Sequence, residues 1–223
     1  MNKWKRLSRP PTPGFTQAML RHDVPLVRDK ATLRRIEALF SKFFRAEDQL
    51  DFHALKRRGD LVVVVMSLSS DWMHKFIAGM RAKGTEHIYV AEYFSDYELH
   101  PEHVTEIPLN YDRDKYGSLF SGISSGDWLG LIDGDGRYCC YGVQSFFGYL
   151  IVPAEGGHSF FDDNIWKDYY DFREDVMDND FGDADFCRVW PEIVAARDAL
   201  LAVDQYWRET GFTPPPRSEL FKR

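Results

Sequence analysis

The chain has 223 residues, of which 44% are hydrophobic, 28% charged and 15% aromatic, and its formal net charge is −7. These values are typical of one globular domain and exclude a disordered or fibrous protein. No apolar run approaches the roughly 20 residues that a membrane-spanning helix needs, and Cys139, Cys140 and Cys187 make a poor disulfide framework. We therefore expect a cytoplasmic protein.

The two ends of the chain differ in composition from the part between them. Residues 1–15 include the run Arg9-Pro-Pro-Thr-Pro-Gly14, which disfavours regular backbone pairing, so we expect an extended or disordered basic arm. Residues 212–223 include Thr213-Pro-Pro-Pro-Arg217, and we expect a Pro-rich tail with extended polyproline geometry. Residues 16–211 remain as a single globular domain.

Two helical patterns precede the first predicted strand. Thr32 is suited to cap the first helix, and the pattern continues or restarts farther along the chain until Gly59. The apolar residues of this region recur at helical spacing: Leu33, Ile36, Leu39, Phe40, Phe43, Leu50, Ala54 and Leu55. This helical region leads directly into the strand.

The stretch Asp60–Ser70 contains five consecutive apolar residues, Leu61–Val65, and four of them are valine. Such a short and β-branched run predicts a strand that is buried on both faces. Gly84 stands where the left-handed end of a following helix belongs, and the strand His87–Phe94 comes next. That helix has apolar residues at helical spacing: Trp72, Met73, Phe76, Ile77 and Met80. Together these segments predict a βαβ unit with a right-handed crossover.

The middle of the chain predicts further strands. His100–His103 is typical of a turn, and Val104–Leu109 of a short strand. Beyond a polar loop, the run Asp133-Gly-Asp-Gly136 tolerates positive φ and suits a tight hairpin turn. Three antiparallel strands are expected around and after this turn: 127–132, 137–143 and 146–152. We therefore predict a mixed sheet of five or six strands.

The last third of the chain predicts two helices. The first begins with Asp162 or Asp163 as its cap and ends at Met177, with an apolar face formed by Ile165, Tyr169, Phe172 and Val176. The second begins near Pro191 and ends at Gly211. The predicted fold is therefore a single α+β domain, in which about five helices flank a sheet with one βαβ unit and one antiparallel hairpin.

Three serines lie where the first predicted strand meets the following helix: Ser67, Ser69 and Ser70. Backbone N–H groups and the positive end of the helix dipole favour an anion at such a junction. This junction lacks the glycines and the lysine of nucleotide-binding loops, so helix capping is the ordinary role for its serines. An anion site here would belong to a hydrolase or a transferase.

The sequence predicts no metal site, no cofactor and no catalytic residue. Asp133 and Asp135 resemble the start of a calcium loop, but the later positions of that loop hold the wrong residue types, Arg137, Tyr138 and Gln144. Pro101 separates His100 from His103, and no cysteine pair has metal-ligand spacing. Aromatic neighbours of Cys139 and Cys140 indicate burial rather than a reactive thiol.

The acidity of the chain is concentrated in residues 160–186. This segment carries ten acids and two bases, so its net charge is −8 and the rest of the chain sums to +1. Its aromatics Trp166 and Tyr170 fall off the apolar face of the predicted helix, and we expect them to be partly exposed. Charge of one sign favours fast association with a basic partner, and exposed aromatics act as anchors. The predicted partner-binding residues are Asp168, Asp171, Asp175, Asp178, Asp180, Asp183, Asp185, Trp166 and Tyr170.

Two segments resemble the SUKH group of immunity proteins. Asp127–Tyr138 is similar to that group's hairpin, which has a Trp-bearing strand and an Asp/Gly-rich turn, and Ser159–Asp163 is similar to the start of its final helix. The resemblance covers a minor part of the chain and does not include the predicted βαβ unit. It implies an immunity role rather than another binding role.

We therefore predict a non-enzymatic protein that inhibits or neutralises a basic protein partner. An immunity protein or antitoxin that blocks a nuclease-type toxin fits this description, with no direct binding to nucleic acid or membranes. Three alternatives stay open: an enzyme with an anion site at Ser67–Ser70, an acidic protein that mimics DNA, and a solvated acidic surface without a partner.

Overall fold

The structure is a computed structural model that describes residues 26–45, 50–66, 70–93, 99–110, 128–143, 147–155, 160–177 and 191–221. The predicted basic arm, residues 1–15, lies outside this part of the chain. Six helices are assigned in the described residues: α2 (Lys30–Phe40), α3 (Phe52–Arg58), α4 (Ser70–Ala82), α7 (Asp163–Met177), α9 (Pro191–Thr210) and α10 (Arg217–Leu220). None of these helices is both long enough and apolar enough to cross a lipid bilayer.

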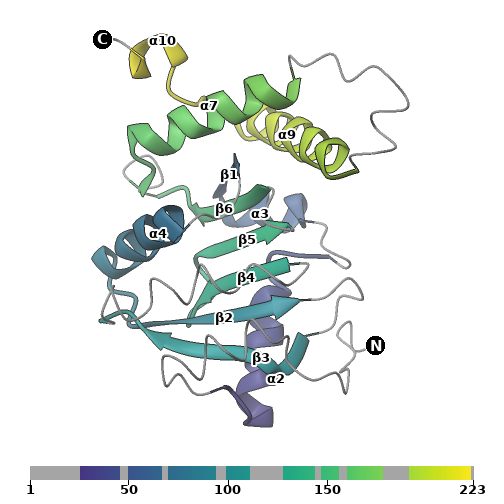
Figure 1. The fold of residues 1–223 in the computed structure, drawn as a ribbon, viewed down its shortest axis with the longest axis vertical. Coiled ribbons are helices and arrows are strands. Elements are labelled where there is room, and N and C mark those ends of the chain that lie inside the picture. The colour runs from purple at the N-terminus through teal and green to yellow at the C-terminus, as the bar shows by residue number, and fades with distance from the viewer. Residues whose placement is uncertain are drawn as a thin grey trace.

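Six strands form one open sheet in the order β1-β6-β5-β4-β2-β3 (Figure 1). Their bounds are β1 Asp60–Met66, β2 His87–Tyr93, β3 Leu99–Pro108, β4 Trp128–Asp133, β5 Cys139–Val143 and β6 Phe147–Pro153. The predicted α+β fold is confirmed, and so is the hairpin, because β4 pairs with β5 and β5 pairs with β6.

The sheet is antiparallel rather than mixed, since every neighbouring pair of strands is antiparallel. Strands β1 and β2 run in the same direction and are joined through α4, as a βαβ unit requires. However, β6, β5 and β4 lie between them, so the two strands do not touch. The hairpin strands from later in the chain fill the space between the two strands of the βαβ unit.

Strand β1 is buried on both faces, as predicted, because Leu61–Val65 are at most 3% exposed. Helices α2 and α4 lie on opposite faces of the sheet (Figure 1). Phe44, just after α2, has its ring 4.4 Å from that of Tyr141, whereas Phe160 contacts both Phe76 of α4 and Tyr138. Since Tyr138 and Tyr141 are three residues apart along an extended segment, their side chains project to opposite faces.

Among the described residues, side chains of α9 and not another strand cover the outer edge of β1. The Tyr206 hydroxyl donates to the carbonyl oxygen of Asp60 at 2.5 Å, and Trp207 Nε1 donates to the carbonyl oxygen of Val62 at 2.8 Å. Alternate carbonyls of an edge strand point away from the sheet and need a partner when they are buried. Side chains of α9 supply those partners, which fixes this helix against the sheet.

The structure corrects two local predictions from the sequence, the residue that caps α2 and the turn at His100–His103. Asp29, not Thr32, caps α2, because its carboxylate accepts the backbone N–H of Thr32 at 2.7 Å. His100 and His103 belong to β3 and not to a turn. Strand β3 is the other edge of the sheet, where a proline such as Pro101 breaks no necessary ladder bond.

Glycines at helix ends behave as predicted. Gly59, Gly84 and Gly211 have φ values of 68°, 84° and 72°, which is the left-handed region that favours glycine. Gly59 ends α3, and its backbone N–H donates to the carbonyl oxygens of Leu55 and Lys56. These sharp endings set where β1 and the C-terminal residues begin.

Candidate protein-binding surface

Helix α7 carries the acidic residues that the sequence singles out. It starts after Asp162, whose Oδ1 accepts the backbone N–H groups of Asn164 and Ile165 at 3.1 and 3.0 Å. The buried face of α7 consists of Ile165, Trp166, Tyr169, Phe172 and Val176. With this face packed against the protein, the acids of α7 occupy the remaining surface.

The prediction that Trp166 is a partly exposed anchor is wrong, because its side chain is only 2% exposed. Its indole stacks on Phe212 with ring centroids 5.9 Å apart and meets Trp207 of α9 at 6.1 Å. The helical pattern in the sequence predicts that α7 packs against a single surface and buries one stripe of residues. In the structure the helix is also enclosed by α9 and by residues 212–221, so its buried arc is wider than a single stripe.

Residues 212–221, which we call the C-terminal strap, pack along α7. Tyr170 is half-buried, and its hydroxyl donates to the carbonyl oxygen of Pro215 at 2.8 Å. Leu220 of α10 is buried, at 7% exposure. The Arg217 guanidinium binds the carboxylate of Glu174 and lies 3.8 Å from that of Asp171. The expected Pro-rich tail is therefore a docked segment that ends in a short helix.

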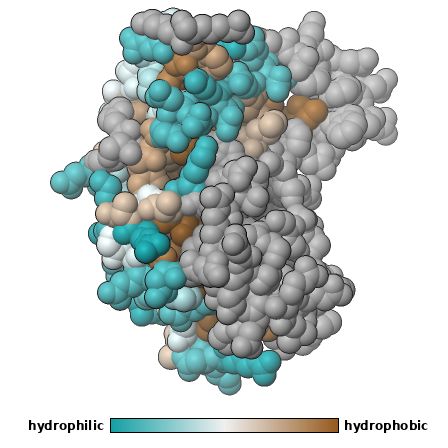
Figure 2. Space-filling model, turned by 60° about the vertical axis from the view of Figure 1, so that its left-hand side comes forward, coloured by the Kyte–Doolittle hydropathy of each residue, from teal (hydrophilic) through white to brown (hydrophobic). Residues whose placement is uncertain are grey.

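The acidic face of α7 is defined by five exposed carboxylates: Asp163, Asp168, Asp171, Glu174 and Asp175. Partial burial raises the pKa of Asp168 above its ordinary value, an effect that Lys75 opposes and Asp171 and Asp162 reinforce. Asp171 and Asp175 are exposed, as predicted. Hydrophilic residues gather over the upper end of the molecule (Figure 2), where α7 and α10 lie in Figure 1.

Four predicted binding residues, Asp178, Asp180, Asp183 and Asp185, lie outside the described residues, and so do Ser67 and Ser69 of the predicted anion site. Ser70 is the first residue of α4, and its side chain is likewise not described. The structure thus brings together Asp168, Asp171 and Asp175 from the predicted partner-binding set.

Sequence reasoning missed the exposed aromatic residue of this surface, Phe221. It is 41% exposed, and its ring lies 5.2 Å from the guanidinium carbon of Arg217 and 6.0 Å from Lys167 Nζ. It therefore stands beside the acidic face. In the sequence, the segment Arg217–Phe221 follows three prolines and ends in a leucine and a phenylalanine after a polar run. This apolar pair is the sequence signal for Phe221, but it is overlooked when the whole segment is predicted to be an extended tail.

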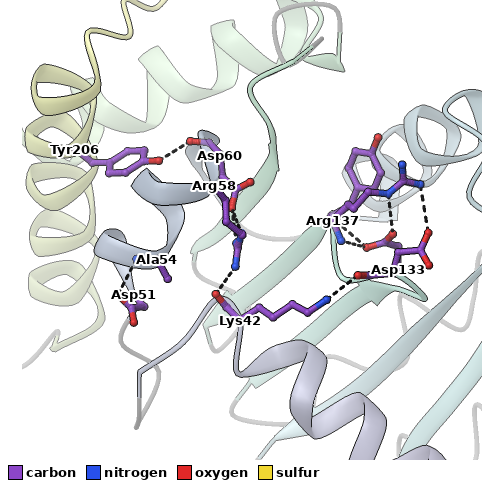
Figure 3. A network of polar contacts seen from close by, with 10 residues as sticks. Lys42, Asp51, Ala54, Arg58, Asp60, Asp133, Arg137 and Tyr206 are labelled. Atoms are coloured by element: carbon purple, nitrogen blue, oxygen red, sulfur yellow. Dashed lines mark hydrogen bonds and ion pairs between the residues drawn. The ribbon is translucent and has the colours of Figure 1, made fainter.

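Two buried carboxylates lie elsewhere and hold the fold together (Figure 3). Asp60 is bound by the guanidinium of Arg58, and burial raises the pKa of its carboxyl. Asp133 Oδ1 accepts the backbone N–H groups of Arg137 and Tyr138 at 2.6 and 2.8 Å, which closes the hairpin turn. Asp133, weighed above as a calcium ligand, is therefore a turn residue.

Cys139 and Cys140 are buried, as the sequence indicates, and burial raises the pKa of both thiols. A buried thiol of this kind is a poor nucleophile. Among the described residues, no group of three His, Cys, Asp or Glu side chains is placed to hold a metal ion.

Comparisons with protein-family models, curated proteins and solved structures find no match for this chain. The resemblance to SUKH immunity proteins thus receives no support from a family model. Function has to be argued from the residues themselves, since a fold alone hosts many functions.

Proposed function

We propose that this chain is a non-enzymatic binding protein that inhibits or neutralises a basic protein partner, as an immunity protein or antitoxin does toward a nuclease-type toxin. The observation that carries the proposal is the acidic face of α7, five exposed carboxylates on a helix whose opposite side is buried. A charged face on a firmly packed helix is pre-organised, so little ordering is needed when a partner binds.

The charge balance of α7 supports a basic partner. The helix has only two bases, Lys167 and Arg173, and the guanidinium of Arg173 is 2.7 Å from the carboxylate of Asp204 on α9. Arg173 is thus turned toward α9 and neutralises an acid there. Arg217 of the C-terminal strap binds Glu174 and lies 3.8 Å from Asp171, and Lys75 acts on Asp168, so bases from other elements partly neutralise this face. The five carboxylates still outnumber Lys75, Lys167 and Arg217, and the remaining negative charge speeds encounter with a positively charged surface, an effect that weakens as salt rises.

Phe221 supplies the apolar contact that such an interface needs. Interfaces draw much of their binding energy from a few aromatic or arginine anchors surrounded by polar contacts. Phe221 is exposed beside the acidic face, whereas Trp166 is buried. Tyr170 is half-buried, in line with its predicted partial exposure, but its hydroxyl bonds the carbonyl oxygen of Pro215 in the C-terminal strap. We assign the anchor role to Phe221 in their place.

The test starts with capture of partners from host lysate at low and high salt, using the full chain as bait. A single basic protein that is lost as salt rises is the expected result. Several unrelated DNA-binding proteins would instead indicate a DNA mimic. Absence of any salt-sensitive partner would contradict the proposal.

Association kinetics with the captured protein then test the surface. Charge reversal in Asp171→Lys/Asp175→Lys should slow association about tenfold to a hundredfold at low salt and little at high salt. The matched control reverses two exposed acids away from α7, Glu86→Lys/Glu155→Lys, with the same change in net charge. Equal slowing in both variants would show that net charge, and not the acidic face, controls association.

A further inference from the structure

A cavity of about 640 Å³ opens where α3 and α9 end and β1 begins. This volume lies within the range of roughly 300–1,000 Å³ found for small-molecule sites. Neither the acidic face of α7 nor the hairpin turn contributes to it. The lining residues that matter here are Lys56, Asp60, Leu61, Ala154, Glu209 and Phe212.

One wall of the cavity is apolar and held in place by the fold. Leu61 is 3% exposed within β1, and Phe212 stacks on the buried indole of Trp166. Ala154 adds a small side chain at the end of β6, where its backbone N–H donates to the carbonyl oxygen of Gly59 at 2.8 Å. Such a wall suits the apolar stem of a ligand and exists before the ligand arrives.

The polar side of the cavity combines the ends of two helices with two ion pairs, Arg58 with Asp60 and Lys56 with Glu209. Helices α3 and α9 both end here, at the left-handed glycines Gly59 and Gly211, and the C-terminal end of a helix carries partial negative charge on its carbonyl groups. Two carboxylate residues, Asp60 and Glu209, line the same cavity. Asp60 is already bound by Arg58, which leaves Glu209 as the adaptable acid.

The protein itself places an ammonium group at this point. Lys56 Nζ lies 3.3 Å from Glu209 Oε2, and both side chains are 46% exposed, so the pair sits at the rim. Gln205 Nε2 donates to the other carboxylate oxygen of Glu209 at 2.9 Å. Hydrogen bonds from Gln205 and Lys56 lower the pKa of Glu209, so this carboxylate is ionised at neutral pH.

We propose that this cavity binds an organic cation, a primary ammonium or guanidinium group on an apolar stem. The stem packs against Phe212 and Ala154, and the cation takes the place of the Lys56 ammonium at Glu209. The cation comes either from a small free amine or from a lysine or arginine side chain of another protein. This inference does not depend on the function proposed for α7.

Calorimetric titration of the full chain tests the ligand class. The probes are phenethylamine and agmatine, with phenethyl alcohol as the neutral control of the same shape. We expect saturable binding of the amines and none of the alcohol. No heat from either amine at millimolar concentration, or equal binding of the alcohol, would overturn the proposal.

Two substitutions with opposite expected effects test the geometry. Glu209→Gln should weaken amine binding about tenfold or more, because a charge-assisted hydrogen bond is lost. Lys56→Gln should tighten binding, because it removes the competing ammonium. A purely structural role of this ion pair would weaken binding in both variants, and that result would contradict the proposal. Glu219→Gln, on exposed α10, is the control that should change nothing.

Ala154→Phe fills the cavity without changing charge and should abolish binding of both amines, while unchanged binding would place the ligand elsewhere.

Comparing agmatine with the peptide acetyl-Gly-Arg-Gly-amide separates the two sources of the cation, since the tighter ligand shows whether a free amine or a protein side chain is preferred. These titrations need no protein partner, so their outcome is independent of capture through α7.

Discussion

Two regions of this molecule, which we call the aromatic corner and the polar corner, differ in how well their buried polar atoms are hydrogen-bonded. The aromatic corner, formed by Trp166, Tyr169, Trp207 and Phe212, joins α7, α9 and the C-terminal strap through ring contacts. Two of its buried polar groups have partners, since the Tyr169 hydroxyl bonds Asp204 and Trp207 Nε1 bonds the carbonyl oxygen of Val62 in β1.

The polar corner, formed by Thr85, His87, Asp133 and Arg137, lies at the end of β4 and the start of β2. Three of its buried atoms accept or donate no hydrogen bond among the described residues: Thr85 Oγ1, His87 Nε2 and Asp133 Oδ2. Within the described part of the chain, Arg137 Nε lies 3.8 Å from Asp133 Oδ2, which is too far for a hydrogen bond. We infer that the aromatic corner stabilises the protein mainly through ring packing, whereas the buried carboxylate of the polar corner makes stability depend on pH.

The largest effect is expected from Trp166→Ala, in the aromatic corner. Removing a buried indole leaves a cavity among Tyr169, Trp207 and Phe212, and should lower the free energy of unfolding by about 3–5 kcal/mol. Urea unfolding followed by circular dichroism measures it. A loss below about 1 kcal/mol would mean that Trp166 is exposed, as the helical pattern alone suggests.

A smaller effect is expected from Tyr206→Phe, which removes one hydroxyl and keeps the ring. The carbonyl oxygen of Asp60 then has no partner from α9, and the free energy of unfolding should fall by about 1–3 kcal/mol. Tyr170→Phe is the matched control, because its hydroxyl bonds Pro215 in a half-buried position that water reaches. Equal losses in the two variants would show that the hydrogen bond from Tyr206 to the edge of β1 contributes no more to the free energy of unfolding than the half-exposed hydrogen bond of Tyr170.

The smallest effect is expected from Asp133→Asn, in the polar corner, and it should depend on pH. Burial raises the pKa of Asp133 above its ordinary value of 3.8, although the backbone N–H groups of Tyr138 and Arg137 oppose the change. The native state therefore binds more protons than the unfolded state, and stability falls as pH rises from the unfolded pKa through the folded one.

Asparagine keeps an oxygen acceptor for the hairpin turn but does not ionise. The stability of Asp133→Asn relative to the wild type should therefore increase as pH rises from below 3.8 and level off above the folded pKa. Unfolding curves at a series of pH values measure this difference. A relative stability that stays constant with pH would show that Asp133 is not destabilised by its burial.

Local patterns in the sequence predict each helix and strand better than they predict which strands pair with one another. The valine run of β1, the helix 163–177 and the glycine ends are all set by residues a few positions apart, and each appears where expected. The order of strands is not local: β1 pairs with β6, and nothing within β1 identifies that partner. For the same reason the sequence predicted a mixed sheet.

The candidate surface illustrates the same limit at the level of single residues. The acids Asp168, Asp171 and Asp175 are exposed because a charged side chain avoids burial wherever its helix packs. The position of Trp166 depends instead on Phe212, a distant residue in a segment that reads as a tail. The role of Phe221 also depends on a distant contact. Its exposed ring lies beside the acidic face only because α10 packs against α7, and the local sequence does not indicate that packing.

The closure of β1 by α9 also bears on how the chain is made. Four consecutive valines on an open strand edge are a template for intermolecular β-pairing and aggregation. During synthesis β1 leaves the ribosome well before Tyr206 and Trp207, and its neighbour β6 also follows much later. The nascent chain therefore carries an uncovered aggregation-prone segment for most of its translation, so chaperone dependence should track the delay until α9 emerges.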